Sequence, residues 1–199
     1  MFPYKKYRKF VDEKLFELIQ QGNTSAFDEL YHRYCRRLLG YFFRMLGRDE
    51  QRARDLLQDV IMKIVERRTG NTPVKNFSAW IFTAAHNMCK NEYRNHKIRD
   101  VFDQSCELDT TVKSIQQQSH SAEEHLDQKL FQNALFAELQ KLDSLERSTF
   151  LLRYQENFTI KQISEILSCP QGTTKSRLHH VTKKLAQRLR AFNPYSNVV

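Results

Sequence analysis

Glycine and proline are scarce in this chain of 199 residues, which holds five and four of them. Both residue types interrupt regular secondary structure, and long stretches of the sequence show hydrophobic residues at a 3.6-residue period. The two observations together predict an all-α fold. A hydrophobic content of 40% is enough for real cores, so the chain does not belong to the disordered class.

Long hydrophobic runs are also missing. The segment LLGYFFRML is short and interrupted by Arg44, and nothing approaches the roughly 18 apolar residues of a membrane span. The N-terminal sequence MFPYKKYRKFVDEK lacks the continuous apolar core of a signal peptide. We therefore expect a protein of the cytoplasm, outside the membrane, where its four cysteines stay reduced. These are Cys35, Cys89, Cys106 and Cys169.

Signatures of catalysis are absent as well. The sequence has no Gly-rich phosphate loop and no nucleophile elbow, so we predict neither an enzyme nor a cofactor. Two pairs place a His and a Cys one helical turn apart, His32 with Cys35 and His86 with Cys89. Such pairs can hold zinc. Both cysteines fall on apolar sides of predicted helices, so packing as small hydrophobes is the preferred interpretation and no metal site is predicted.

Positive charge is abundant and unevenly distributed. The net charge is +9, made up of +8 in residues 1–100, −5 in residues 101–150 and +6 in residues 151–199. A basic excess suggests a polyanionic partner. Two basic blocks on either side of an acidic one suggest two modules that face nucleic acid, joined by an acidic tether.

The most informative pattern lies near the C-terminus. Thr159 can cap a helix whose apolar residues recur at helical spacing, and Cys169-Pro170 then breaks the pattern. The following helix is expected to bury Leu178, Val181, Leu185 and Leu189. Its other face carries Lys175, Ser176, His179, His180, Lys183 and Lys184, with Arg177 beside them. This is the pattern of a helix-turn-helix whose second helix enters the major groove of DNA. An ordinary helical hairpin with a solvated basic face is the alternative.

Four further helices are expected before residue 100. Their approximate ranges are 11–20, 24–45, 50–67 and 76–97, with Thr24 or Ser25 capping the second, Gly47 ending it and Asp49 capping the third. The C-terminal half of the fourth helix displays Asn87, Lys90, Asn91, Arg94, Asn95 and Lys97. This polar, basic face suits nucleic acid, although a soluble helix end favoured by the macrodipole explains it equally well.

A stretch rich in Ser, Thr and Gln, residues 100–120, reads as a flexible acidic linker. Helical periodicity returns at Ser121, which with Glu124 has the spacing of a capping box. Asp143 or Ser144 is expected to cap the next helix, and the helix-turn-helix follows.

These segments resemble, in the correct order, the extracytoplasmic-function (ECF) sigma factors of bacterial RNA polymerase, in the sigma-70 family. FDELYHRYCRRLLGYFFRMLG followed by ARDLLQDVIMKIVE is similar to the first parts of the promoter-melting domain. FSAWIFTAAHNMCKNEYRNHK is similar to the helix that reads the −10 element. LQKLDSLERSTFLLRYQENFTIKQISEILSCPQGTTKSRLHHVTKKL is similar to the domain that reads the −35 element. The resemblance covers the chain from about Asp12 to Leu189.

The resemblance implies two helical domains. Residues 1–99 would bind core polymerase, recognise the −10 element and assist strand opening, and residues 121–199 would recognise the −35 element. The implied partners are promoter DNA, the clamp helices of the largest polymerase subunit, the flap of the second-largest subunit and an anti-sigma factor. The protein would act as a monomer. The rival hypothesis is a free-standing repressor with a helical effector domain, but such repressors usually dimerise and no heptad seam is visible.

The resemblance also implies roles for individual residues. The −35 contacts would be Thr173, Lys175, Ser176, Arg177, His179 and His180. The −10 contacts would be Asn71, Asn76, Asn87, Lys90 and Arg94, with an extruded base received by the loop of residues 69–76. Asp55, Gln58 and Asp59 would dock on the clamp helices.

Three departures from the family pattern carry expectations of their own. The base-capturing loop has no aromatic residue, so a stacking platform there is either missing or provided by Phe77. His180 stands where arginine is frequent, and Thr174 replaces an aliphatic residue. Because the linker averages a short span, we also expect the two domains to pack together in solution and mask DNA surfaces.

Overall fold

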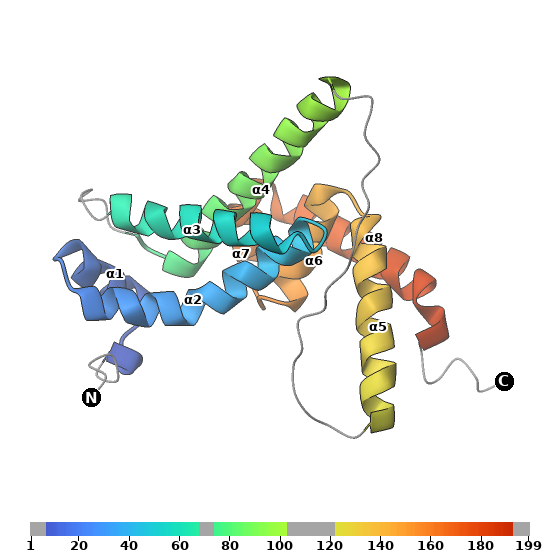
Figure 1. Ribbon diagram of the computed structural model, residues 1–199, viewed down its shortest axis with the longest axis horizontal. Helices are drawn as coiled ribbons and strands as arrows, with labels where there is room; N and C mark the ends of the chain where they lie inside the picture. Colours follow the sequence, from blue (N-terminus) through green and yellow to red (C-terminus); the bar gives the residue numbers. More distant parts are fainter. Residues whose placement is uncertain (1–6, 68–73, 103–121, 193–199) are drawn as a thin grey trace.

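The computed structural model describes residues 7–67, 74–102 and 122–192 (Figure 1). Helices make up the regular structure of these residues, and they contain no strand, which confirms the all-α prediction. The elements are α1 (Asp12–Gln20), α2 (Thr24–Met45), α3 (Glu50–Glu66), α4 (Phe77–Phe102), α5 (Ala122–Gln140), α6 (Ser144–Tyr154), α7 (Ile160–Ile166), α8 (Gln171–Arg188) and the 3-10 turn η3 (Arg190–Phe192).

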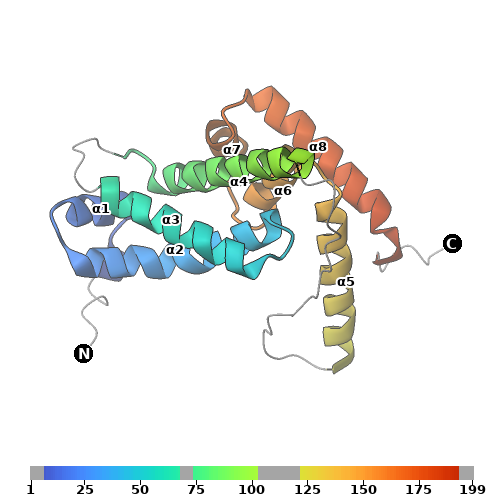
Figure 2. The ribbon, with the colours of Figure 1, turned by 45° about the horizontal axis from the view of Figure 1, so that its top comes forward.

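Helices α1 to α4 form an N-terminal unit. Helices α2 and α3 make a hairpin, and α1 and α4 pack against it (Figure 2). The apolar stripe of α2 is almost fully buried, with exposures of 0–1% for its inward residues Leu30, Tyr34, Leu38, Tyr41, Phe42 and Met45. The predicted helical period of this segment is therefore the period of its core contacts.

Asn23 caps the start of α2. Its Oδ1 accepts a hydrogen bond from the N–H of Ala26 at 3.0 Å, and its Nδ2 donates to the hydroxyl of Tyr7 at 2.9 Å. The predicted cap at Thr24 or Ser25 is wrong by one or two residues. An Asn side chain satisfies the orphan N–H groups at a helix start as well as Ser or Thr does.

Three other predicted helix signals in this part of the chain are confirmed. Gly47 has a φ of +71° just after the end of α2, where a left-handed residue commonly closes a helix. Asp49 accepts from the N–H of Arg52 at 2.9 Å at the start of α3. Asp143 forms a capping box with Glu146 at the start of α6.

Helix α4 is longer than predicted. It continues through Phe102, so the linker does not begin at residue 100. Helix propensity across IRDVF extends the helix past the point where its hydrophobic period fades. Most of the predicted linker, residues 103–121, lies outside the described residues, and so does the predicted cap at Ser121.

Helices α5 to α8 form a C-terminal unit. Helices α6, α7 and α8 pack around Leu151, Leu152, Ile163, Val181 and Leu185, which are 0–3% exposed. Helix α5 runs away from this core and touches α8 on one side (Figure 1). Its outer end leaves Leu130 half exposed, at 50%.

The two units pack against each other. Helix α7 lies on α4 and α6 lies on α2, so the buried side chains of both units form one continuous core (Figure 2). At its centre the rings of Phe82 and Phe158 meet edge to face, with centroids 5.2 Å apart. The expected packing of the two parts is therefore present.

Candidate nucleic-acid interface

The helix-turn-helix is formed by α7, a tight turn and α8. Thr159 begins α7 in a reciprocal capping box, in which Gln162 Oε1 accepts from the Thr159 N–H at 2.9 Å. The turn contains Ser168 at φ +50°. Pro170 then precedes α8 as its N-cap residue, in agreement with the predicted break at Cys169-Pro170.

The buried face of α8 fixes which side of the helix faces out. Thr174, Val181 and Leu185 are buried, whereas Leu178 and Leu189 are half buried. The hydroxyl of Thr174 lies 3.3 Å from the Cys169 sulfur and 3.4 Å from the Pro170 carbonyl oxygen. A buried polar group therefore has partners at the position where the family usually has an aliphatic residue.

Five of the six predicted −35 residues are exposed on α8: Thr173, Lys175, Ser176, His179 and His180. Arg177 is half buried and its Nη1 lies 3.7 Å from the Cys169 sulfur. At 100° per residue, Ser176 and His179 lie opposite the buried face, and Lys175 and Arg177 lie on its two flanks. The predicted set thus divides into a facing group and a flanking group.

Lys183 belongs to the facing group although the family resemblance does not single it out. It is exposed and lies one turn beyond His179, opposite the buried residues. Its neighbour Lys184 differs, because its Nζ is 2.8 Å from a carboxylate oxygen of Glu146 on α6. Helical spacing alone could have separated these two lysines, but the ion pair could not be read from the sequence.

The predicted −10 face lies on α4. Asn87, Lys90 and Arg94 are exposed, and together with Asn91 they lie within one side of the helix, spaced three and four residues apart. Two amides and two cations on one helix face can offer hydrogen bonds to base edges and charge to phosphates.

The loop before α4 departs from expectation. Asn76 is half buried, and its Oδ1 accepts from the Ala79 N–H and from the Ser78 hydroxyl, both at 2.9 Å. That oxygen is used to cap α4, so only the amide NH2 group remains for DNA. Asn71 lies outside the described residues. Phe77 is fully buried against Phe16, Tyr34 and Trp80, so the suggestion that it provides a stacking platform is wrong.

His86 lies on the packed side of α4, beside the −10 face and one turn before Lys90. It is 5% exposed, and its Nδ1 is 3.1 Å from the Ser148 hydroxyl of α6. Burial, and then the positive charges of Lys90 and Arg177, lower the pKa of this imidazole to about 4. His86 is therefore neutral at pH 7 and belongs to the contact between the two units.

The predicted polymerase-docking face lies on α3. Gln58 and Asp59 are exposed, and Asp55 is half buried with its Oδ1 accepting from Gln51 Nε2 at 3.1 Å. Met62 lies on the same face and is 49% exposed. Met62 was not predicted for this face, because a Met at helical spacing usually belongs to a core.

The His-x-x-Cys pairs form no metal centre among the described residues, where no three His, Cys, Asp or Glu side chains come together. Cys89 is fully buried, and burial raises the pKa of its thiol far above the ordinary range. Its packing as a small hydrophobe agrees with the preferred interpretation.

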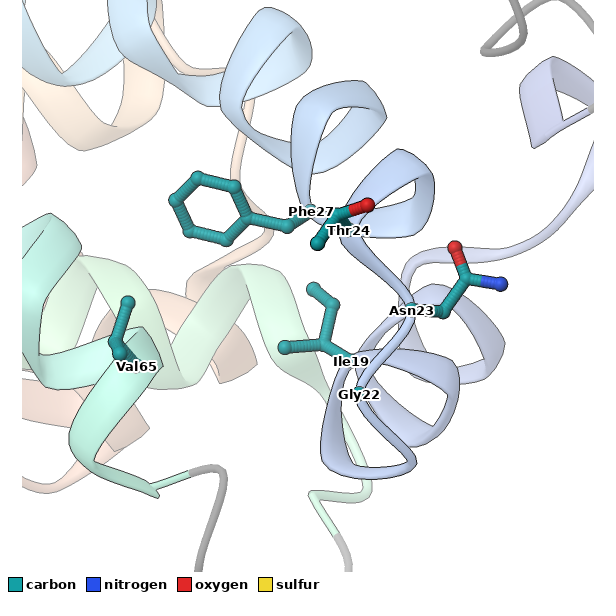
Figure 3. Close-up of a pocket in the computed structure, with 6 residues that line it drawn as sticks. All are labelled: Ile19, Gly22, Asn23, Thr24, Phe27 and Val65. Carbon is teal, nitrogen blue, oxygen red and sulfur yellow. The ribbon is translucent and has the colours of Figure 1, made fainter.

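A small apolar pocket of about 160 Å³ lies where the α1–α2 turn meets α3 (Figure 3). Figure 3 shows Ile19, Phe27 and Val65 facing one another, while the Asn23 side chain points away. Its described lining residues include no titratable side chain, so this pocket does not have the arrangement of a catalytic site. Within the described ranges, no helix is both long and apolar enough to cross a membrane.

Comparison with known proteins decides what these helical faces belong to. Residues 30–98 match the family Sigma-70 region 2, and residues 132–185 match Sigma-70, region 4. The ECF RNA polymerase sigma factor EcfG of Rhodopseudomonas palustris is 30% identical over 144 residues, covering 72% of this chain and 75% of the relative. The chain belongs to the sigma-70 family.

This sigma factor is similar along most of its length to other members. It is 27% identical over 186 residues to the RNA polymerase sigma-H factor of Pseudomonas aeruginosa, covering 89% of this chain and 93% of that one. Its fold is shared with the sigma factor RpoE of Bartonella quintana, solved in complex with the anti-sigma factor NepR. The TM-score is 0.67 at 22% identity, with coverage of 82% of this chain and 96% of that one.

The protein is accordingly an ECF RNA polymerase sigma factor, which serves promoter recognition in transcription initiation. Region 2 lies in the N-terminal unit and region 4 in the C-terminal unit. A free-standing repressor would not account for the match to region 2, so that alternative is set aside.

Proposed function

We propose that three exposed helix faces divide the work of this sigma factor. The face of α8 contacts the −35 element, the face of α4 contacts the −10 element, and the face of α3 docks on the clamp helices of the largest polymerase subunit. One observation supports this division above the others. Each face is polar and exposed while the opposite side of the same helix is packed, so each helix has a single free side.

The −35 assignment rests on the N-terminal half of α8. Ser176, His179 and His180 would approach base edges, because they lie opposite the packed side. Lys175 and Arg177 on the flanks would hold phosphates, and so would Lys183, which lies one turn beyond the base-facing residues; these contacts fix the position of the helix without reading sequence. Thr173 lies in the first turn, where the positive end of the helix dipole also favours a phosphate.

The −10 assignment rests on the amide and cation pattern of α4. Asn87 and Asn91 carry both donors and acceptors, and Lys90 and Arg94 carry charge for the backbone of the strand. Asn76 contributes by capping the helix that carries these groups. Capture of an extruded base costs a few kcal/mol of lost stacking, which pocket contacts would offset. The protein would thus assist opening by binding rather than by catalysis.

The docking assignment on α3 gains support from Met62. A solvated helix face usually carries charged side chains alone, whereas this one combines Gln58 and Asp59 with a methionine that is half exposed. An apolar side chain beside polar ones is typical of a protein-binding surface, and methionine is enriched at interface cores. This face would meet the clamp helices in the cytoplasm, with the sigma factor as a monomer.

A second docking surface lies at the end of the C-terminal unit. Leu130 and Phe131 of α5 are 50% and 39% exposed, and Phe131 meets the 40% exposed Phe192 ring edge to face at 5.8 Å. We assign this surface to the flap of the second-largest polymerase subunit. The relative solved with NepR further supports an anti-sigma factor as a regulatory partner of this protein.

The docking assignment is tested by reversing one charge. Asp59→Arg should abolish binding to core polymerase, because it puts a positive charge where the proposed contact is made by a carboxylate. Gln58→Ala should weaken that binding. Both residues are exposed, so the free energy of unfolding should change by less than about 0.5 kcal/mol. Core binding by surface plasmon resonance, beside thermal unfolding by circular dichroism, measures both.

Asp28→Arg is the matched control, since it makes the same charge reversal at an exposed position of α2, outside the docking face on α3. It should bind core like the wild type. Normal core affinity in Asp59→Arg would refute the assignment of this face.

A further inference from the structure

The −10 face of α4 continues toward the start of the helix. Trp80 lies seven residues before Asn87, so at 100° per residue the two side chains project within about 20° of each other, roughly 10 Å apart along the helix axis. The expected masking of DNA surfaces is wrong, because this face and that of α8 stay exposed although the two units are packed together. A DNA strand that contacts Asn87 and continues to the loop before α4 would therefore pass over Trp80.

The ring of Trp80 is held in place from below. It is half buried and packs against Phe16 of α1 and Phe77 of α4, with ring centroids 5.7 and 5.5 Å away. Phe16 and Phe77 are themselves fully buried. Because side chains in a close-packed core have little room to move, Trp80 offers a fixed surface to a group that lies over it.

Arg67 lies over this ring. It is the C-cap residue of α3, and its guanidinium carbon Cζ is 5.2 Å from the centroid of the Trp80 ring. A guanidinium is attracted to the face of an aromatic ring, and most strongly to that of tryptophan. Arg67 is the last described residue before the loop, and Trp80 lies in the first turn of the helix that follows the loop. The pair therefore joins the two helices beside the place where an extruded base is expected.

The guanidinium of Arg67 has an unused hydrogen-bond donor. Its Nε is buried and has no hydrogen-bond partner among the described residues. Arg52 of the same helix differs, because its Nε and Nη2 donate to the two carboxylate oxygens of Glu92 at 2.8 and 2.7 Å. Buried donors without an acceptor are rare in native proteins. Arg67 is thus positioned to bond an acceptor that a ligand brings.

A nucleobase supplies acceptors that match a guanidinium. The planar fork of arginine presents neighbouring N–H groups, which suit two neighbouring acceptors. Guanine has such a pair in O6 and N7. Unpaired cytosine has one in O2 and N3. Adenine and thymine alternate acceptors with donors along their edges, so they would lose one of the two bonds. A phosphate would also accept from arginine, but it carries no sequence information.

We propose that Arg67, held over Trp80, reads an unpaired base of the −10 element that has two neighbouring acceptors, either guanine or cytosine. The inference rests on the proposed −10 face of α4. It places a base-selective contact at the end of that face nearest the loop. Asn76 at this end has only its NH2 group free, because its oxygen caps α4.

Substitution with lysine separates base reading from charge. Arg67→Lys keeps the positive charge but loses the planar fork, whereas Arg67→Met loses both. Holoenzymes with each variant are used to select from fork-junction DNA whose single-stranded −10 region is randomised. The wild type should prefer guanine or cytosine over adenine and thymine by about tenfold at one position. Both variants should reduce that preference to less than about threefold and leave the preferences at other positions unchanged.

Arg36→Lys is the matched control, because Arg36 is exposed on α2 and belongs to none of the proposed DNA-binding faces. It should select the same sequences as the wild type. Circular dichroism of the free proteins checks that each variant is folded.

Three results would overturn the role of Arg67. The first is a wild type that prefers neither guanine nor cytosine at any −10 position. The second is wild-type selection by folded Arg67→Lys and Arg67→Met, which would show that Arg67 only joins α3 to α4. The third is an equal loss for all four bases in Arg67→Met that lysine restores, which would show a phosphate contact.

Asn87→Ala, tested on the same library, examines the −10 face separately. Binding and selection like the wild type in Asn87→Ala would refute the proposed −10 face. Impaired binding in Asn87→Ala, together with unchanged selection by Arg67→Lys and Arg67→Met, would refute the role of Arg67 alone.

Discussion

Helices α4 and α8 carry similar polar groups but at different distances from the helix start. The predicted −35 residues of α8 lie in its N-terminal half, where the helix dipole adds positive potential. The amides and cations of α4, from Asn87 to Arg94, lie around its middle, more than two turns from the helix start, and its other side is packed against α7. If the proposed faces bind DNA, we expect α8 to bind mainly by attracting phosphates and α4 to bind mainly by hydrogen bonds to bases.

The sharpest test of that contrast is Asn87→Ala on α4. The amide contacts form after a base has left the stack, so we expect a loss of about 1–3 kcal/mol in open-complex formation and little loss in closed-complex affinity. Holoenzyme fluorescence with a base analogue in the −10 element measures the unstacking. Asn95→Ala is the control, because Asn95 is exposed at the edge of this polar side, about 80° around the helix from Asn87. Equal losses in both complexes would make Asn87 an ordinary groove contact.

The packed side of α4 predicts that the contact between the two units depends on pH. His86 faces Ser148 of α6, Lys90 of its own helix and Arg177 of α8, with Tyr41 beyond Ser148. The pKa of His86 is depressed to about 4 while the two units are packed together. The packing of the units is therefore fully favoured above the ordinary pKa of about 6.5, and it weakens as pH falls. Between pH 7 and 5 the free energy that favours packing of the two units should fall by about 2 kcal/mol.

Small-angle scattering of the free protein at a series of pH values measures this separation of the two units. His86→Gln, which does not titrate in this range, should flatten the profile. A wild-type profile that is flat from pH 7 to 5 would contradict the role of His86 at the interface.

On α8 the paired lysines separate phosphate contacts from structural ones. Lys183→Ala should weaken binding to −35 DNA and lower the slope of log affinity against log salt by roughly one unit. Lys184→Ala should change that slope much less, because its ammonium is paired with Glu146. Holoenzyme binding titrations at several salt concentrations measure both slopes. Identical slopes for the two variants would remove Lys183 from the phosphate-binding group.

The smallest expected effect is on specificity alone. His180→Arg should leave total affinity within a few-fold and change which −35 bases are tolerated, since arginine bonds guanine in a bidentate manner. Selection from a library of −35 variants detects the shift. An unaltered preference would show that His180 faces the DNA backbone or solvent.

Local rules predicted most of the helices. Hydrophobic period and capping residues gave α2, α3, α6 and α7 nearly to the residue, because both signals act within one or two turns. The error at Asn23 arose where several polar residues compete for one cap. The error at the end of α4 arose where helix formers continued without a hydrophobic period.

The candidate site was only partly predictable, for a different reason. Helical spacing identified the exposed faces of α3, α4 and α8, but it could not show that the oxygen of Asn76 is used as a cap or that Phe77 is buried. Those outcomes depend on neighbours in space. The bond between Arg37 and Glu156 joins residues far apart in the chain, and no pattern in either helix alone signals it.

The C-terminal end of α2 is capped by the side chains of Gln140 and Arg147, which belong to the C-terminal unit. This cap has a consequence for how the sequence of the protein can diverge. The acceptors there are main-chain carbonyl groups of Arg44 and Met45, which every amino acid possesses. Descendants could replace those two side chains and keep the acceptors unchanged. The donors Gln140 and Arg147 have no such freedom, since the bonds reside in their side-chain nitrogens. Sequence change should therefore be faster at Arg44 and Met45 than at Gln140 and Arg147.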